Sequence, residues 1–477
     1  MMMTTTPRES RFAALTDRHL DTLVSIVGDA NVVRPGDDTF DRYTHDETEK
    51  YRFPPAVGVR AETADQIAEV LKLATAERLP VTPWGAGTGL SGAALAVFGG
   101  ISLSLERMNR IIDIDLDNMF VVTQPGVITQ VLQEAVQQHG LYYPPDPASR
   151  GSCTIGGNIV MNSGGMRCVK YGVTKDYVAG LRAVLADGTP VGFGGRRMKD
   201  VAGYNMVQTL VGSEGTLAVI TEATLRLIPY PTHRRLLLAP FASYEAAAAC
   251  VAAIFRRRIT PSAVEFLDQP AIRCTSKHMG KTWPAADDCA AQLMIEVDGF
   301  HEDVLDGQVE VIAECCMEAG SDDVILADTA QREADLWAMR RVMGEAVKSL
   351  STYKEEDTCV PRARLPELVR GEKDNSARHG ITLMSYGHAG DGNLHQNQLQ
   401  KDLPDDEWKR VTPGAITEIF ELTVALGGTI TGEHGVGWVQ RQWLPVMQSP
   451  AEIALQRRVK DAFDPAGILN PGKVFPD

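Results

Sequence analysis

The sequence predicts an α+β protein in which a glycine-rich ligand-binding domain precedes a ferredoxin-like antiparallel-sheet domain. From about residue 81 to 230, short β-like runs alternate with glycine-rich turns, a pattern typical of a strand-rich domain. After Pro229-Tyr230-Pro231, two successive β-α-β units follow and predict an antiparallel sheet backed by helices. We expect four ranges: a helical lead-in over 1–56, the ligand-binding domain over 57–230, a substrate or cap domain over 231–425, and a segment over 426–477 that packs back on the ligand-binding domain.

In the first half of the chain, a capping sequence at Thr63–Gln66 predicts the start of a helix. The apolar residues that follow fall on one helical face: Ile67, Val70, Leu71 and Ala74. Runs rich in β-branched and apolar residues predict strands at 101–105, 120–123, 181–185 and 217–220.

In the second half, each β-α-β unit has its own predicted elements. The first unit has strands at 235–238 and 262–267 around a helix at 244–256. The second unit has strands at 292–297 and 323–326 around a helix at 303–319.

Composition narrows the class of protein. The net charge of −15 argues against nucleic acid as a partner, because phosphate binding relies on basic surface. No apolar run approaches the ~18 residues of a membrane span, and the first residues lack the apolar core of a signal peptide. The 8 cysteines contain no Cys-x-x-Cys pair, which argues against a zinc ribbon or iron–sulfur cluster. We therefore expect a cytoplasmic protein, with peripheral association at the inner membrane as the alternative.

The loop Gly87-Thr88-Gly89-Leu90-Ser91-Gly92 formally matches the dinucleotide fingerprint. That fingerprint must open a crossover helix, and the predicted strand at 101–105 follows too soon for one. Residues 83–92 are better explained as exposed backbone N–H groups around a diphosphate, with glycine permitting close approach.

Three further glycine-rich clusters lie at 144–158, 162–165 and 211–217. Four such loops in one domain indicate the lining of an extended polar ligand. A β-rich domain with many tight turns stays open as the alternative explanation.

The segment Gly387–His395 and the motif Gly432-Glu433-His434-Gly435 bring two imidazoles, a carboxylate and a third histidine together among glycines. His388, His395 and Glu433 form the ligand set of an open divalent-metal site, and His434 is placed to act as a base. The His-x6-His spacing is not that of a zincin helix. A single histidine is more often structural, but three of the 10 histidines fall in these two motifs.

With these motifs, the sequence resembles the flavoprotein family typified by vanillyl-alcohol oxidase, in its D-lactate, glycolate and D-2-hydroxyglutarate dehydrogenase branch. The resemblance spans roughly residues 40–475 and implies an FAD-binding domain of that family's PCMH type. Its motifs are 83–92, 145–147, 154–158, 212–216, 388–395, 432–437 and 464–473.

The resemblance implies that FAD is bound by the glycine loops and by Asn470 near the flavin. Because no histidine lies between Gly85 and Gly100, we expect FAD without a covalent link. The implied FAD-binding residues are Pro83, Trp84, Gly85, Ala86, Gly87, Thr88, Gly89, Leu90, Ser91, Pro145, Asp146, Ser149, Ser152, Thr154, Gly156, Gly157, Asn158, Ser163, Gly164, Gly212, Glu214, Gly215, Ile220, Glu433 and Asn470.

The same resemblance implies zinc or manganese at His388, His395 and Glu433, and substrate contacts from Arg340, Lys354 and Asn393. Solvated helix charges remain the alternative for Arg340 and Lys354. Branch members specific for hydroxyglutarate tend to carry a hydroxyl residue where this chain has Gly344, which favours a small monocarboxylate.

The predicted function is therefore oxidation of a D-2-hydroxy acid, D-lactate or glycolate, to the 2-oxo acid, with the C2 hydride passing to flavin N5. The expected electron acceptor is a quinone, an electron-transfer flavoprotein or an iron–sulfur subunit, and a homodimer is compatible with the sequence. The alternatives are a D-2-hydroxyglutarate dehydrogenase, an oxygen-using oxidase, a non-catalytic flavin-binding subunit and a flavin-free metal hydrolase.

Overall fold

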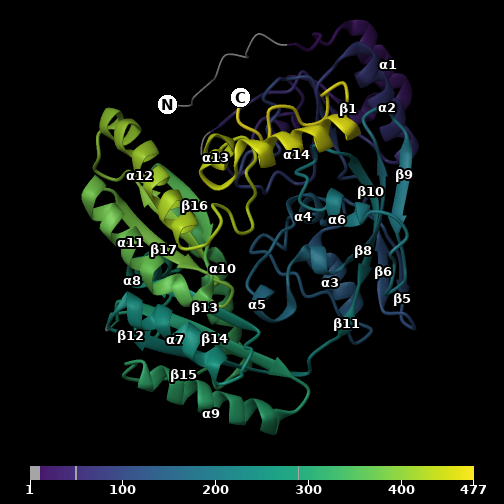
Figure 1. Ribbon diagram of the computed structural model, residues 1–477. Helices are drawn as coiled ribbons and strands as arrows, with labels where there is room; N and C mark the ends of the chain where they lie inside the picture. Colours follow the sequence, from purple (N-terminus) through teal and green to yellow (C-terminus); the bar gives the residue numbers. More distant parts are fainter. Residues whose placement is uncertain (1–10, 49–50, 288) are drawn as a thin grey trace. The chain divides into compact units, whose positions relative to one another are not determined.

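The computed structural model describes residues 11–48, 51–287 and 289–477 (Figure 1). It divides the chain into two compact units. Unit 1 comprises residues 1–163, 173–230 and 433–477, and unit 2 comprises residues 164–172 and 231–432. Residues 164–172, which were expected in the ligand-binding domain, belong to unit 2. Residues 426–432, which were expected in the C-terminal segment, also belong to unit 2.

The described residues of unit 1 form three sheets. A four-stranded sheet has the order β1 (Val32–Val33), β2 (Val57–Arg60), β4 (Ile101–Ser104), β3 (Val81–Trp84), in which β2 and β3 run parallel to β4. An antiparallel sheet has the order β5 (Ile111–Asp115), β6 (Phe120–Thr123), β10 (Val219–Arg226), β8 (Val178–Val184), β9 (Pro190–Gly194). The third sheet pairs β7 (Leu141–Tyr142) with β11 (Ile228–Pro229).

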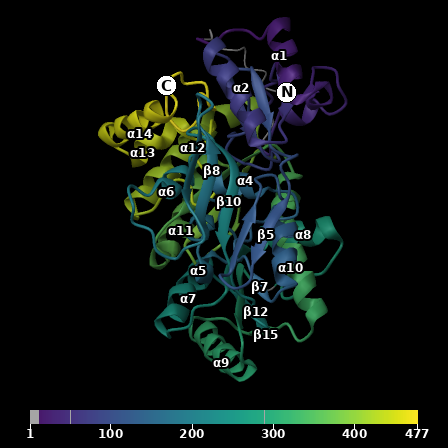
Figure 2. The same cartoon turned by 90° about the vertical axis from the view of Figure 1, so that its right-hand side faces the viewer.

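Several helices of unit 1 pack on these sheets, and α1 (Asp17–Val27) lies beside α2 (Ala64–Glu77) (Figure 2). The Thr63 hydroxyl caps α2 by accepting a hydrogen bond from Gln66 N, which confirms the predicted start of this helix. The remaining helices are α3 (Thr129–Gln137), α4 (Ile155–Met161), α6 (Met206–Leu210), α13 (Leu444–Met447) and α14 (Pro450–Phe463), with 3₁₀ turns at Asp29–Asn31, Asp41–Tyr43, Thr174–Asp176 and Arg441–Trp443.

The expected helical lead-in over residues 1–56 is wrong for most of the described part of that range. Between residues 11 and 48, α1 is followed by two 3₁₀ turns and by β1, which pairs with β2. Val32 and Val33 are both buried, so a short edge strand there removes more apolar surface from water than an exposed helix would. Residues 1–10 and 49–50 lie outside the described residues.

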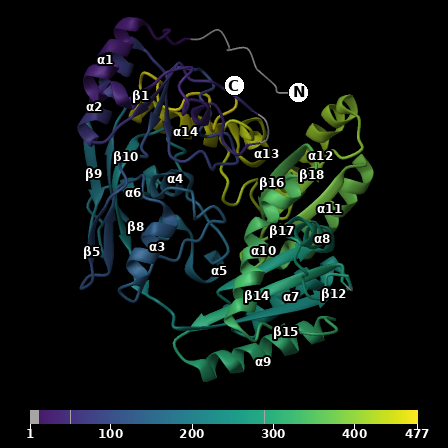
Figure 3. The ribbon, with the colours of Figure 1, turned by 180° about the vertical axis from the view of Figure 1, so that it is seen from behind.

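Unit 2 is built on one seven-stranded antiparallel sheet (Figures 1 and 3). Its order is β15 (Ile325–Leu326), β12 (His233–Phe241), β14 (Ala291–Gly299), β13 (Ala263–Asp268), β17 (Thr382–Gly387), β18 (Asn393–Leu399), β16 (Tyr353–Cys359). The first four strands have the ferredoxin-like order that two β-α-β units produce. This confirms the predicted α+β class.

Helices cover both faces of the unit 2 sheet. One apolar core joins the sheet to α7 (Tyr244–Arg256), α9 (Glu302–Glu318) and α11 (Leu365–His379), and a second joins it to α8 (Gln269–Met279) and α10 (Ala330–Lys348). The other helical elements are α5 (Cys168–Tyr171), α12 (Asp405–Ala425) and a 3₁₀ turn at Arg362–Arg364. None of the helices in the described ranges has the length and apolar composition of a membrane span.

A buried carboxyl group lies between α11 and the sheet. Glu372 accepts hydrogen bonds from Gln396 Nε2 at 2.6 Å and from the Ser385 hydroxyl at 3.1 Å. Burial raises the pKa of Glu372 to about 8, although Lys373 and these hydrogen bonds oppose the shift. The neutral form of the side chain is therefore the one that suits the folded state.

This raised pKa predicts that Glu372→Gln stabilises the protein at alkaline pH. Because the folded-state pKa lies above the ordinary value, the wild-type side chain favours folding at low pH, and this contribution is lost as pH rises towards 8. We expect the advantage of the variant in unfolding free energy to be roughly 2 kcal/mol larger at pH 9 than at pH 6. Urea denaturation at both pH values measures it, with exposed Glu318→Gln as the control. An advantage independent of pH would contradict this origin.

Candidate functional site

The first glycine loop of unit 1, residues 85–100, connects β3 to its parallel neighbour β4 without a helix, as the sequence predicts for a loop that is not a Rossmann turn. Gly87 and Gly92 have φ values of +71° and +79°, which favour glycine. A Cβ atom at Gly85 would lie 2.8 Å from Thr154 Oγ1. The first two predicted loops therefore approach each other closely.

Several buried polar atoms of these loops have no hydrogen-bond partner among the residues that the structure describes. They are Trp84 Nε1, Ser91 Oγ and Ser213 Oγ. Buried polar groups are rarely left unpaired in folded proteins, so these atoms fit a loop system that binds a polar ligand. Ser213 was not among the predicted cofactor residues, although it stands between Gly212 and Glu214.

Asn470 links two of the predicted cofactor segments. Its side-chain amide donates to Glu214 O at 2.7 Å and to Ala93 O at 2.9 Å. The Glu214 carboxylate in turn accepts from Val436 N at 2.8 Å and Gly437 N at 2.7 Å. Burial raises the pKa of Glu214 to about 7 in spite of these hydrogen bonds. Within unit 1, Glu214 thus supports the turn that follows Glu433 and His434.

The other predicted cofactor residues have varied surroundings. Asn158 donates to Thr129 Oγ1 at 2.6 Å inside unit 1, and Ile220 is a buried residue of β10. Ser152 donates to Ser149 O in an exposed turn. Gly164 belongs to unit 2, whereas Ser163 is the last residue of its segment in unit 1.

The two histidines of the Gly387–His395 segment are brought together in unit 2. His388 begins the loop between β17 and β18, and His395 is in β18. Their ring centroids are 5.1 Å apart, and ring nitrogens of the two lie within 4.8 Å. A Cβ atom at Gly392 would lie 1.9 Å from Val360 O, so only glycine permits this tight loop. Gly392 therefore allows the close backbone approach that we expected of the glycines around the two histidines.

A buried carboxylate orients His388. Glu265 on β13 is 2.9 Å from His388 Nδ1, and it accepts from Arg340 Nε at 2.7 Å. Burial by itself would raise the pKa of Glu265, but the Arg340 charge and His388 outweigh it and lower the pKa. With Nδ1 directed at Glu265, Nε2 is the His388 nitrogen that would coordinate a metal ion. Metal-binding histidines commonly have such carboxylate partners.

A second buried carboxylate, Asp357 on β16, faces His395. Its Oδ1 is 3.5 Å from His395 Nδ1 and accepts from Asn393 Nδ2 at 2.6 Å. Its Oδ2 accepts from Thr431 Oγ1 at 3.0 Å and Gly432 N at 2.9 Å. Asp357 therefore lies beside the His395 ring and also holds the backbone of Gly432, the residue that precedes Glu433. This histidine pair with two carboxylates suits a divalent cation such as zinc or manganese.

Sequence reasoning missed Glu265 and Asp357. A signal for Glu265 was available, since it interrupts the otherwise apolar run Ala263-Val264-Glu265-Phe266-Leu267, and a buried charge needs a partner. Asp357 gave no such signal, because it lies in the polar run Tyr353–Cys359.

Glu433 and His434 are the first two residues of the last unit 1 segment. Glu433 Oε1 lies 3.8 Å from His434 Nε2. Glu433 directly follows Gly432, whose backbone N–H donates to Asp357. The metal role of Glu433 and the base role of His434 stay predictions.

The three predicted substrate residues differ in placement. The Arg340 guanidinium is buried against Glu265, and the Asn393 amide donates to Asp357. Lys354 pairs across the sheet with Gln398, whereas Asp357 pairs with His395. Because successive residues of a strand point to opposite faces, Lys354 lies on the face opposite His395. This placement argues against a direct substrate contact for Lys354.

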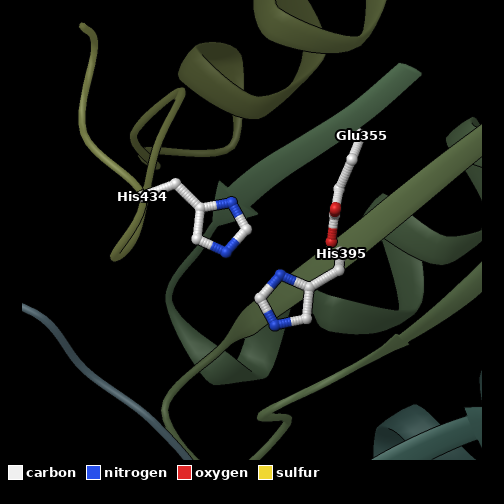
Figure 4. A group of neighbouring side chains, drawn as sticks. All are labelled: Glu355, His395 and His434. Atoms are coloured by element: carbon white, nitrogen blue, oxygen red, sulfur yellow. The ribbon is translucent and has the colours of Figure 1, made fainter. Parts of the chain in front are cut away.

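Two further residues occupy the His395 face of the sheet. Glu355 pairs with Asn397 in the ladder, and a Glu355 carboxylate oxygen lies within 4.8 Å of a His395 ring nitrogen. Figure 4 shows the Glu355 carboxylate end directed towards His395. The Asn397 side chain is fully buried, and in the described part of the chain neither of its amide atoms has a hydrogen-bond partner. Asn397 thus offers both a donor and an acceptor beside the histidine pair.

The role of Glu265 can be tested by Glu265→Gln. We expect the affinity for zinc or manganese to fall 10- to 100-fold, because the partner that orients His388 loses its charge. The matched control is Glu296→Gln, since Glu296 is equally buried and is paired with Arg167. Both variants lose a buried ion pair, but the control does not touch a histidine. Equal metal affinities in the two variants, measured by chelator competition, would contradict the assignment.

Sequence comparisons identify relatives along most of the chain. Residues 55–194 match the FAD binding domain model, and residues 230–474 match the model of the C-terminal domain of FAD linked oxidases. The glycolate oxidase subunit GlcD of Bacillus subtilis is 40% identical over 91% of this chain and 92% of its own length. The D-lactate dehydrogenase of Anaerostipes hadrus is 37% identical over 92% of this chain and 94% of its own.

The fold is shared with solved flavoproteins. p-Cresol methylhydroxylase superposes with a TM-score of 0.78, covering 97% of both chains at 18% sequence identity. This likeness confirms the PCMH-type architecture. Together with the matched domains and the relatives above, it shows that the chain belongs to the FAD-linked oxidase family and is an FAD-binding oxidoreductase.

Proposed function

We propose that this enzyme oxidises a small D-2-hydroxy acid, D-lactate or glycolate, to the 2-oxo acid. The observation that carries the proposal is the buried pair His388 and His395, each facing its own carboxylate, in a chain of an FAD-linked family. Such a pair favours a divalent cation, which a 2-hydroxy acid can chelate through its carboxylate and hydroxyl oxygens. The names of the two relatives above agree with this substrate class.

FAD would be bound without a covalent link by the glycine loops of unit 1, where Ser91 and Ser213 offer unpaired hydroxyl groups. It supplies an acceptor for a hydride at flavin N5. Zinc or manganese would be held by His388, His395 and Glu433, and it would supply Lewis-acid polarisation of the substrate hydroxyl.

The remaining roles belong to side chains of the protein. His434 accepts the hydroxyl proton of the substrate as general base. The Asn397 amide hydrogen-bonds the substrate beside the histidine pair, which would satisfy its unpaired atoms. Arg340 acts through Glu265, since the ion pair between them holds the carboxylate that orients His388.

Electrons leave the reduced enzyme to a quinone, an electron-transfer flavoprotein or an iron–sulfur subunit. A D-2-hydroxyglutarate dehydrogenase is the second candidate, because a relative of that name from Stutzerimonas stutzeri is 31% identical over 96% of this chain.

The test is anaerobic reduction of the purified flavoprotein by a panel of D- and L-2-hydroxy acids. We expect bleaching of the flavin by D-lactate or glycolate and transfer of electrons to an artificial dye. Peroxide formation in air without dye would instead identify an oxidase. A yellow protein that no hydroxy acid bleaches would refute the proposal and favour a non-catalytic flavin-binding subunit, and a colourless preparation would favour a metal hydrolase.

A further inference from the structure

Helix α10 presents three residues at four-residue spacing, Arg340, Gly344 and Lys348, along one stripe. A Cβ atom at Gly344 would lie 3.2 Å from the Tyr386 hydroxyl, and the Arg340 guanidinium lies over the Tyr386 ring at 5.2 Å. Tyr386 is opposite His395 in the β17–β18 ladder. The stripe therefore runs along the sheet face that carries the histidine pair.

Each cation of this stripe is paired with a carboxylate of the sheet. Arg340 Nη2 is 2.5 Å from Glu265, and Lys348 Nζ is 2.5 Å from Glu355 Oε2. The Glu355 side chain is only 8% exposed. An incoming anion thus meets the Glu355–Lys348 ion pair next to His395 rather than an unpaired lysine.

We propose that Glu355 is a specificity residue that selects monocarboxylic 2-hydroxy acids by repelling a second carboxylate on the substrate. This inference rests on the proposed function. The first carboxylate of the substrate is needed at the histidine pair, and the second carboxylate of a dicarboxylate would bring another negative charge to the sheet face on which Glu355 lies beside His395. Like charges a few ångströms apart in a partly buried site repel strongly, and specificity commonly arises from such unfavourable contacts with the wrong ligand.

Removing either partner of the Lys348–Glu355 ion pair is expected to shift the substrate preference in opposite directions. Glu355→Gln removes the repelling charge and leaves Lys348 available to a second carboxylate, so the preference for monocarboxylates should fall at least tenfold. Lys348→Gln leaves the Glu355 charge uncompensated, so the preference should rise. A purely structural defect would affect both substrate classes alike in both variants.

The experiment uses the holoenzyme with FAD and metal bound. Anaerobic flavin reduction compares D-lactate with D-2-hydroxyglutarate, and calorimetry on the oxidised enzyme compares binding of pyruvate with binding of 2-oxoglutarate. Glu318→Gln, on α9, removes an exposed negative charge as the control. Metal content is measured in every variant, because a carboxylate beside His395 is also a candidate ligand.

The outcomes separate this inference from the proposed function. Opposite shifts of the preference in Glu355→Gln and Lys348→Gln, with metal retained, support it. Flavin reduction with an unchanged preference refutes the inference alone, and loss of metal from Glu355→Gln makes Glu355 a ligand and overturns it. A wild-type flavin that no 2-hydroxy acid reduces refutes the proposed function, and this inference with it.

Discussion

Replacing His434 by alanine is expected to slow anaerobic flavin reduction by a 2-hydroxy acid about 1,000-fold, within the range of general-base contributions. Without the imidazole, the proton of the substrate hydroxyl has no positioned acceptor while the hydride leaves C2. The yellow colour and the metal content should stay, since the role assigned to His434 is that of a base and not of a ligand to FAD or the ion. Stopped-flow absorbance of the flavin gives the rate directly.

His139→Ala is the matched control for this variant, because His139 is an exposed histidine of unit 1 next to the end of α3. Its reduction rate should equal that of the wild type. A base is also expected to leave a pH dependence in the wild-type rate that the alanine variant lacks. Unchanged reduction kinetics in His434→Ala would remove this residue from the mechanism.

Removing the divalent ion with a chelator is expected to lower flavin reduction by at least about 100-fold, since polarisation of the substrate hydroxyl is lost. FAD should remain bound, because the glycine-loop residues and Asn470 that are assigned to it are not among the proposed ligands of the ion. Zinc or manganese added back should restore the rate. His395→Ala should show the same loss without recovery, because one of two neighbouring imidazoles is missing.

His278→Ala serves as the control in unit 2, since His278 is a part-exposed residue in the last turn of α8. It should bind metal and respond to the chelator as the wild type does. Full activity of the wild type after metal removal, checked by elemental analysis, would show that the ion takes no part in the reaction.

Periodicity predicted the ferredoxin-like half of unit 2 closely. The expected helix at 244–256 coincides with α7, and the expected strand at 262–267 differs from β13 by one residue at each end. These elements have one clear apolar face that packs into a core, so the sequence pattern and the burial agree.

The strands that carry the site could not be predicted in the same way. β16 reads Tyr-Lys-Glu-Glu-Asp-Thr-Cys, and buried polar residues occur on both of its faces and on both faces of β18. Glu372, Ser385 and Gln396 form a polar network on one face, and Asp357 and His395 meet on the other. Alternation of apolar and polar residues is therefore absent from β18, which lies inside the sheet, and from β16, which forms its edge.

The sequence by itself determined the family, and it predicted the glycine loops and the two histidines as site residues, because glycine loops and histidine motifs are local features whose chemistry depends on residue type and spacing. Only the tertiary structure identified Glu265 and Asp357 as the partners of those histidines, 123 and 38 positions away in the chain. The structure also shows that Glu355 and Asn397 lie on the sheet face of His395, whereas Lys354 lies on the opposite face. Strand register decides these points, since moving one residue along a strand turns its side chain to the other side of the sheet.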